Sequence, residues 1–341
     1  LREKDHLFLN GDDPSIRTML TDANTEQIRR LLGEHRTVFL DEAQRIPGIG
    51  LTLKIITDQF KDVQLMVSGS SSFDMTQEVN EPLTGRKWEY TLLPISWQEF
   101  EDHVGYLDAE QQMETRLIYG SYPEIVSFPG EERERLQQLV GSYLYRDILA
   151  YAGIRKPEVL DRLLQALAFQ VGSEVNYNEL AETTGLNKGT VATYIDILEK
   201  GYIVFRLNSF ARNLRNEIKR SRKVFFYDNG VRNAIIGNFQ PLDLRPDKGA
   251  LWENFLVSER LKYNLYHSTG ARMYFWRTRQ QQEIDYVEER DGRITAYKFK
   301  WKPRTAKISS SFLSAYNAAA YTIHRENFRD FVQPPITQEQ P

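Results

Sequence analysis

The sequence predicts an α/β protein that begins with a parallel sheet, and two neighbouring patterns carry this prediction. Residues 38–40 form a short, fully apolar run, as expected of a central strand that is covered on both faces. Residues 50–60 then have apolar side chains at helical spacing, and residues 63–68 predict a second buried strand. A strand, helix, strand unit closes with a right-handed crossover, so the two strands should lie side by side and parallel.

Polar side chains follow both predicted strands. Asp41 and Glu42 follow the first strand, and Ser68 and Ser70 follow the second. The two sets should meet at one edge of the sheet, which is where open α/β sheets bind ligands. P-loop NTPases present carboxylates in this way: Asp41 would hold the Mg²⁺ of a nucleotide, and Glu42 would orient the water that attacks the γ-phosphate. The alternatives are that Asp41 caps a helix and that the serines form a turn.

Four short segments, taken in order, resemble a known family. They are VFLDEAQ at residues 38–44, SGSSS at 68–72, LTGR at 83–86 and LLPISWQEF at 92–100. This arrangement is similar to that of prokaryotic AAA-type ATPases, which join a P-loop core to a C-terminal domain. The resemblance implies ATP and Mg²⁺ as cofactors, Asp41 and Glu42 as the Walker B pair, and Ser68 or Ser70 at the sensor position. It also makes Arg86 a candidate to contact the phosphates, although an exposed salt bridge is the favoured interpretation of Arg86.

One element of the family pattern is absent, because the chain contains no GxxxxGK[ST]. In the family this phosphate-binding loop comes before the Walker B strand. The chain begins with Leu1, and its first twenty residues have the pattern expected after that loop and its helix, with a strand at residues 6–9. We therefore expect the loop and the first strand to precede these residues. A polypeptide without them keeps the fold but loses the backbone amides and the lysine that cradle a triphosphate.

Composition predicts an ordinary soluble protein. The chain has 341 residues, of which 41% are hydrophobic and 27% charged, and this is enough for two or three domains. A net charge of −3 gives no global attraction to nucleic acid or to membranes. The absence of cysteine excludes disulfides, zinc thiolate sites and a cysteine nucleophile. Since no apolar run approaches the roughly 20 residues of a membrane span, we expect a cytoplasmic protein.

The patterns along the chain predict four domains. Residues 1–100 form the P-loop core, in which residues 88–92 alternate as a further strand and a capping box of Ser96 and Glu99 starts a helix. Residues 101–171 have helical periodicity and are interpreted as a lid on the sheet. Residues 172–248 predict a winged helix, and residues 249–341 a further α/β domain.

The winged helix is predicted from a short helix, a turn at Gly185, a second helix and then a strand. Residues 206–223 follow it with seven basic side chains against one acid. The nucleic-acid hypothesis assigns contacts to the exposed start of the second helix and to this stretch, namely Lys188, Thr190, Arg212, Arg215, Lys219 and Arg220. The alternative is a protein-binding module, since Asp196 and Glu199 place acids on the same helix.

Residues 249–341 correspond to a region that in the family resembles the restriction-endonuclease fold. Active members bind a metal through an acid on a helix, an Asp, and an acid-x-Lys strand. Glu253 and Asp285 occupy the first two places, but Lys298 stands where the third carboxylate would be, two residues before Lys300. A protonated lysine has no lone pair to offer a metal. We therefore predict no metal and no nuclease activity, and expect Asp285 and Glu253 to pair with Lys298 and Lys300.

Three functions compete on this evidence. The favoured one is an ATP-binding AAA-type ATPase that couples nucleotide state to the winged helix and the C-terminal domain. The second is a regulator that binds DNA or protein without hydrolysis, and the third is a metal-dependent nuclease. AAA-type relatives often form rings, so a homo-oligomer is possible, and no membrane partner is expected.

Overall fold

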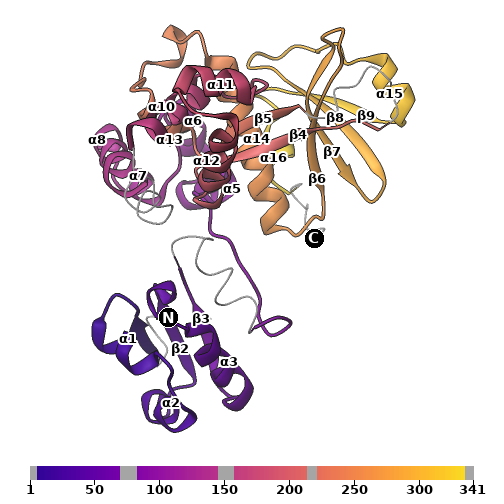
Figure 1. Cartoon of the computed structure of the whole chain (residues 1–341). Coiled ribbons are helices and arrows are strands. Elements are labelled where there is room, and N and C mark those ends of the chain that lie inside the picture. The colour runs from indigo at the N-terminus through magenta and orange to yellow at the C-terminus, as the bar shows by residue number, and fades with distance from the viewer. Residues whose placement is uncertain (1–5, 70–82, 145–156, 213–220, 335–341) are drawn as a thin grey trace. The chain divides into compact units, whose positions relative to one another are not determined.

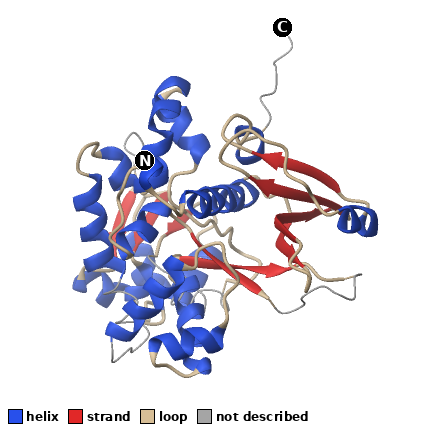
Figure 2. Ribbon diagram, turned by 90° about the horizontal axis from the view of Figure 1, so that it is seen from above, coloured by secondary structure: helices blue, strands red, loops and turns tan. Residues whose placement is uncertain are grey.

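The computed structural model describes residues 6–69, 83–144, 157–212 and 221–334. The chain forms two compact units, Leu1–Thr91 and Leu92–Pro341, and each is described by itself (Figure 1). Both units combine helices and strands (Figure 2). None of the helices in the described ranges is both long and apolar enough to cross a bilayer.

The first unit contains a parallel sheet with strand order β1-β2-β3. Its elements in chain order are β1 (Leu7–Asn10), α1 (Pro14–Leu20), α2 (Thr25–Leu32), β2 (Thr37–Asp41), a 3₁₀ turn η1 (Ala43–Arg45), α3 (Ile49–Gln59) and β3 (Gln64–Val67). The predicted α/β architecture with a parallel sheet is thereby confirmed. The predicted strand at residues 6–9 and helix at residues 50–60 correspond to β1 and α3.

Local sequence explains where these helices begin. The side chain of Asp13 accepts a hydrogen bond from the backbone of Ser15 and caps α1, whose first residue is Pro14. Asn24 and Gln27 form a capping box at α2. The apolar faces of these helices and of α3 pack with Leu9, Val38 and Leu40 of the sheet in one core. On β1 and β2, Phe8 and Phe39 stack at 5.6 Å between ring centroids, and Phe8 is 53% exposed.

The predicted strand at residues 88–92 is wrong. These residues belong to neither a helix nor a strand, and Trp88, Tyr90 and Leu92 are 89%, 83% and 91% exposed. Alternating apolar side chains are typical of a strand, but a strand also requires a hydrogen-bonded neighbour. Within the described residues, no strand pairs with this segment.

Helices occur along the whole length of the second unit. In chain order they are α5 (Trp97–Val104), α6 (Tyr106–Tyr119), α7 (Pro123–Ser127), α8 (Glu132–Gln138), a π-helical segment η2 (Leu139–Leu144), α10 (Pro157–Phe169), α11 (Tyr177–Thr184), α12 (Lys188–Lys200), α13 (Asn229–Ile235), a 3₁₀ turn η3 (Leu242–Leu244), α14 (Lys248–Tyr266), α15 (Ser310–Tyr316) and α16 (Arg329–Val332). Ser96 and Glu99 form the predicted capping box at the start of α5.

A six-stranded mixed sheet crosses the second unit, with strand order β5-β4-β6-β7-β8-β9. The strands are β4 (Val204–Ser209), β5 (Arg222–Phe226), β6 (Arg272–Arg277), β7 (Glu283–Arg290), β8 (Arg293–Phe299) and β9 (Ala319–Ile323). The pairs β4·β6 and β8·β9 are parallel, and the other neighbours are antiparallel. The sheet is therefore continuous across the predicted domain limit at residues 248 and 249. The limits 101–171, 172–248 and 249–341 stay predictions.

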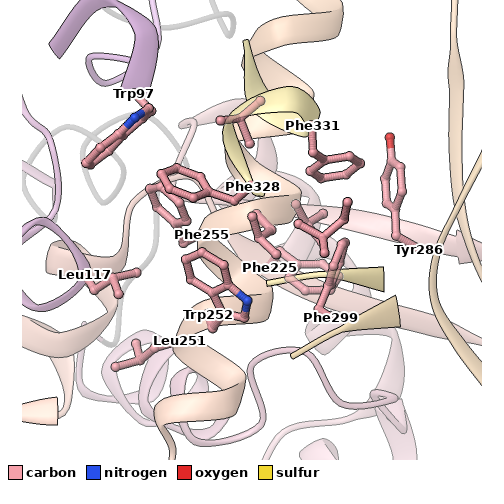
Figure 3. Close-up of a cluster of buried hydrophobic side chains, with 14 of the residues drawn as sticks. Trp97, Leu117, Phe225, Leu251, Trp252, Phe255, Tyr286, Phe299, Phe328 and Phe331 are labelled. Atoms are coloured by element: carbon pink, nitrogen blue, oxygen red, sulfur yellow. The ribbon is translucent and has the colours of Figure 1, made fainter. Parts of the chain in front are cut away.

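Three hydrophobic clusters lie in the described part of this unit, and the two largest hold most of its helices together. The first contains Trp97 of α5, Trp252 and Phe255 of α14, and Phe328 beside α16 (Figure 3). Trp97 and Phe328 lie 5.3 Å apart between ring centroids, and Trp252 and Phe255 lie 5.5 Å apart. The second cluster packs α10 against α11, α12 and β4. Because α5 and α6 bury apolar residues in the first cluster, these faces are occupied within the second unit, and the lid role stays a prediction.

Candidate functional site

Asp41 and Ser68 lie together at the carboxyl ends of β2 and β3. The Ser68 hydroxyl donates a hydrogen bond to Oδ1 of Asp41. The backbone reinforces this contact, since Ser68 N–H donates to the carbonyl of Leu40 at 2.9 Å and Ala43 N–H donates to the carbonyl of Ser68 at 3.1 Å. The structure thus brings together two side chains that stand 27 residues apart. Asp41 does not cap a helix, because the residue before η1 is Glu42.

Glu42 has a left-handed backbone conformation, with φ of 50°. This conformation is uncommon for residues other than glycine, and such positions cluster at functional sites. The side chain of Gln44 donates to Oε2 of Glu42 at 2.6 Å. Burial raises the pKa of Glu42, and the nearby carboxylate of Asp41 raises it further. Gln44 was not predicted as a site residue, although its place in VFLDEAQ was a signal that could have identified it.

Gly11 lies against the backbone that carries both acids. Its N–H donates to the carbonyl of Asp41 at 2.8 Å, and a Cβ atom built on Gly11 would lie 2.2 Å from the carbonyl oxygen of Glu42. The contact is with backbone, so no side-chain rotation can relieve it. Gly11 therefore permits the close approach of β1 to the end of β2, and sequence analysis did not identify it.

Replacing Gly11 with Ala is expected to lower the free energy of unfolding of the first unit by about 1–3 kcal/mol, because the added methyl group forces the Asp41–Glu42 backbone to move. Chemical denaturation measures this loss. Gly249→Ala is the control, since a Cβ at that position meets nothing within 4 Å. If both variants unfold like the wild-type protein, the close approach of Gly11 is not a constraint.

The other predicted nucleotide contacts are placed differently. Arg86 forms an ion pair with Asp58 at 3.1 Å, which is the exposed salt bridge favoured as its interpretation. Its contact with phosphates stays a prediction. Ser70 lies outside the described residues.

The donors at the end of β2 suit magnesium. Carboxylate and hydroxyl oxygens are ligands that Mg²⁺ prefers, and Mg²⁺ is usually held by one or two carboxylates together with waters and substrate phosphates. Within the part of the chain that the structure describes, no group of three or more histidine or acidic side chains could hold a metal by itself. An ion at Asp41 would therefore take its remaining ligands from nucleotide and water.

Three of the six predicted nucleic-acid contacts lie within the described residues. Lys188 is exposed at the start of α12, and the backbone of Thr190 donates to the capping Asn187 at 2.8 Å. Arg212 forms two 2.6 Å hydrogen bonds to Glu289. The predicted contacts beyond Arg212 lie outside the described residues: Arg215, Lys219 and Arg220.

Two described members of the basic stretch contribute less positive charge to the surface than the sequence indicates. Arg206 pairs with Asp196 at 2.7 Å and also with Glu199. The side chain of Lys223 is only 2% exposed. A count of charges treats every side chain as solvated, and this overestimated the basic patch because Arg206 pairs with acids of α12 and Lys223 is buried.

Lys223 lies in a group of carboxylates. Its Nζ atom is 2.9 Å from Oε1 of Glu253 on α14 and 2.6 Å from Oε1 of Glu283 on β7. Burial lowers the pKa of Lys223, but the two carboxylates outweigh burial and the pKa is raised. Burial raises the pKa of Glu253 to about 7, even though Lys223 opposes this shift.

The expected pairing of Glu253 with Lys298 or Lys300 was therefore wrong, because its partner is Lys223. The expected pairing of Asp285 with Lys298 is confirmed at 2.6 Å. The second oxygen of Asp285 accepts the N–H of Phe299 at 2.7 Å.

Comparison with known proteins finds a family match for the first part of the chain. Residues 1–101 match the family model of an AAA domain. This match supports an AAA-type P-loop ATPase family and agrees with the resemblance of VFLDEAQ and the segments after it. Residues 110–242 and 248–333 match two further models, each described as a domain of unknown function.

The relatives are uncharacterized proteins of bacteria and an archaeon. Proteins of Mycobacterium tuberculosis and Mycobacterium bovis are each 28% identical over 311 residues, which is 90% of this chain and 67% of the relative. A Haemophilus influenzae protein is 25% identical over 209 residues, covering 58% of this chain and 52% of the relative. The chain thus spans about two thirds of the length of the mycobacterial proteins and about half of that from Haemophilus.

The AAA-domain match extends beyond the first compact unit. It ends at residue 101, whereas the second unit begins at Leu92. The last ten matched residues, which include LLPISWQEF, therefore fold with the second unit.

Proposed function

We propose that this protein binds and hydrolyses ATP with Mg²⁺ at the carboxyl edge of β1–β3 and couples the nucleotide state to its second unit. The observation that carries the proposal is the hydrogen bond from Ser68 to Asp41, which joins the ends of two parallel strands beside Glu42. The AAA-domain match of residues 1–101 supports the same activity. In P-loop ATPases, triphosphate binding also requires a phosphate-binding loop.

Each side chain of the site is assigned a separate role in hydrolysis. Asp41 would hold Mg²⁺, and the Ser68 hydroxyl fixes the orientation of its carboxylate. When bound there, Mg²⁺ would supply positive charge that stabilises the phosphates. Glu42 accepts a hydrogen bond from the attacking water, and Gln44 holds Glu42 in place through its 2.6 Å contact.

Titration of the full-length gene product with ATP, followed by calorimetry, tests this function. We expect binding that weakens when EDTA removes Mg²⁺, and Asp41→Asn should lose this dependence on Mg²⁺. Asp62→Asn is the matched control, since Asp62 is an exposed carboxylate of the same unit. Absence of ATP binding by the full-length gene product would overturn the proposal.

Residues 172–248 are proposed to form a winged helix, and residues 249–341 a restriction-endonuclease-like domain without nuclease activity. The first part is supported by α11 and α12, joined at Gly185, and by the antiparallel pair β4·β5. The second is supported by Asp285, both of whose oxygens are engaged by Lys298 and by the backbone of Phe299. Plasmid cleavage by the purified protein with Mg²⁺ or Mn²⁺, abolished by Lys300→Ala, would contradict the inactive assignment.

DNA binding without hydrolysis is the second candidate function, and the exposed start of α12 favours it. Lys188 is solvent-exposed at the first position of this helix, where recognition helices contact DNA. We expect a band shift that weakens as salt rises, and Lys188→Ala should reduce the slope of log K against log salt by about 1. Lys200→Ala, at the opposite end of α12, is the control. Absence of a shift, or a shift indifferent to salt, excludes DNA contact here.

A further inference from the structure

Residues 93–97 are a segment in which every backbone N–H has a defined partner. Leu93 donates to the Tyr266 hydroxyl at 3.0 Å, and Ile95 donates to the carbonyl of Ser121 at 2.9 Å. Ser96 donates to Glu99 at 2.8 Å, and Trp97 donates to Oε2 of Glu259 at 2.6 Å. Pro94 has no N–H to satisfy. Residues 93–96 belong to neither a helix nor a strand, and this complete pairing of N–H groups fixes their position.

Two of these contacts, and a third to the carbonyl of Ile95, come from one face of α14. Glu259, Lys262 and Tyr266 are separated by three and four residues, a spacing that aligns side chains along a helix. Lys262 donates to the carbonyl of Ile95 at 3.2 Å and pairs with Glu259 at 2.6 Å. The side chains of Glu259 and Lys262 are 3% and 2% exposed. Two buried charges require such additional hydrogen bonds, and the backbone of the segment supplies them.

Trp97 anchors the end of this segment in the core. Its ring lies 5.9 Å from that of Phe255 on α14 and 5.3 Å from that of Phe328 (Figure 3). The side chains before this segment are exposed to solvent, unlike that of Trp97: Trp88 and Tyr90 are 89% and 83% exposed. The change from exposed to fixed residues comes after Leu92, one residue beyond the boundary of the two compact units between Thr91 and Leu92.

The same helix contacts the rest of the second unit. Asn254 accepts the N–H of Phe226 on β5 at 2.7 Å. Arg260 forms two hydrogen bonds to Glu288 on β7, at 2.8 and 2.7 Å. A displacement of α14 would therefore reach both the β4·β5 pair and the strands that follow.

We propose that residues 93–97 form a clamp with α14, through which the second unit receives the movement of the AAA domain. Glu259, Lys262 and Tyr266 are its positioning residues. The inference rests on the proposed ATPase function and deepens it, because it names the covalent connection and the helix that carry the coupling. It also explains why the AAA-domain match continues to residue 101: its last segment is the part that the second unit holds.

Hydrogen exchange without nucleotide tests the clamp itself. The amides of Leu93 and Trp97 should exchange at least about 10-fold more slowly than those of residues 86–91, since protection follows local stability. Equal exchange rates in the two segments would overturn the proposal, whether or not the protein binds ATP.

Hydrogen exchange with Mg²⁺ and ATP tests the coupling. In the wild-type protein we expect responses at residues 41–46 and also at residues 93–97 and α14. Tyr266→Phe should weaken the second response, and Glu259→Gln with Lys262→Met should remove it, while both variants keep the response at residues 41–46. Tyr263 also lies on α14, but it makes none of the hydrogen bonds to the clamp described above. Tyr263→Phe should therefore behave like the wild-type protein.

The outcomes separate the two proposals. No response at residues 41–46 would overturn the ATPase function and the coupling with it. A response at residues 41–46 without one in α14, or an α14 response that survives in a folded Glu259→Gln/Lys262→Met variant, would overturn the coupling alone. If the double variant does not fold, Tyr266→Phe still tests the coupling, because it removes only a single hydroxyl group.

Discussion

Replacing Glu42 with Gln is expected to lower the rate of ATP hydrolysis by about 10²–10⁴-fold while ATP binding is retained. Gln has nearly the same shape as Glu and keeps one carbonyl oxygen, but it has no negative charge with which to polarise the attacking water. The backbone of Glu42 and its contact with Gln44 place this side chain beside Asp41. Because Asp41 is unchanged in the variant, the proposed Mg²⁺ contact should be retained.

Steady-state release of phosphate measures the turnover, and calorimetry measures ATP binding to the same preparation. Glu34→Gln is the matched control, since it makes the same chemical change at an exposed acid of the first unit. We expect the control to hydrolyse ATP at the wild-type rate. Turnover that persists in Glu42→Gln would remove the role assigned to Glu42 without affecting that of Asp41.

The first sheet was predictable because its signals are local and agree with one another. An apolar run that ends in Asp41 and another that ends in Ser68, separated by one helix, leave the right-handed crossover as the expected connection. That connection alone places the two side chains at one edge. The segment at residues 88–92 has an equally clear alternation but forms no strand. A strand is stabilised by its neighbour, and a pattern of side chains does not contain that information.

The electrostatic predictions failed where partners are distant in sequence. Lys223 and Glu253 are 30 residues apart, and nothing in the local pattern of either residue indicates the other. Period-two alternation did place Lys298 on one face of its strand, where it meets Asp285 on the neighbouring strand. Gly11 was missed for a related reason: its close approach to Glu42 depends on the pairing of β1 with β2, which no single residue encodes.

Replacing Lys223 with Met is expected to lower the free energy of unfolding of the second unit by about 3–5 kcal/mol, because removal of one member of a buried ion pair leaves uncompensated charge. Two carboxylates, Glu253 and Glu283, would lose the ammonium that lies 2.9 and 2.6 Å from them. The loss should exceed that of an ordinary surface substitution several-fold. Chemical denaturation, followed by the signal of the second unit, measures it.

Lys302→Met is the control, since Lys302 is exposed and the chemical change is identical. Adding Glu253→Gln and Glu283→Gln to Lys223→Met should recover part of the lost stability, because the repelling charges are then removed as well. A Lys223→Met variant as stable as Lys302→Met would contradict the assignment of a buried ion pair.

The loss in Lys223→Met should also depend on pH. Burial already raises the pKa of Glu253 to about 7 in the wild-type protein, and without the ammonium the pKa should rise further. A carboxyl group whose pKa is higher in the folded state binds its proton there, whereas in the unfolded state it releases the proton above its ordinary pKa of 4.5. Stability of the variant should therefore fall as pH rises through this window and recover as pH is lowered from about 8 towards 5. A loss that does not change with pH would show that lost packing, and not the charge of Glu253, is responsible.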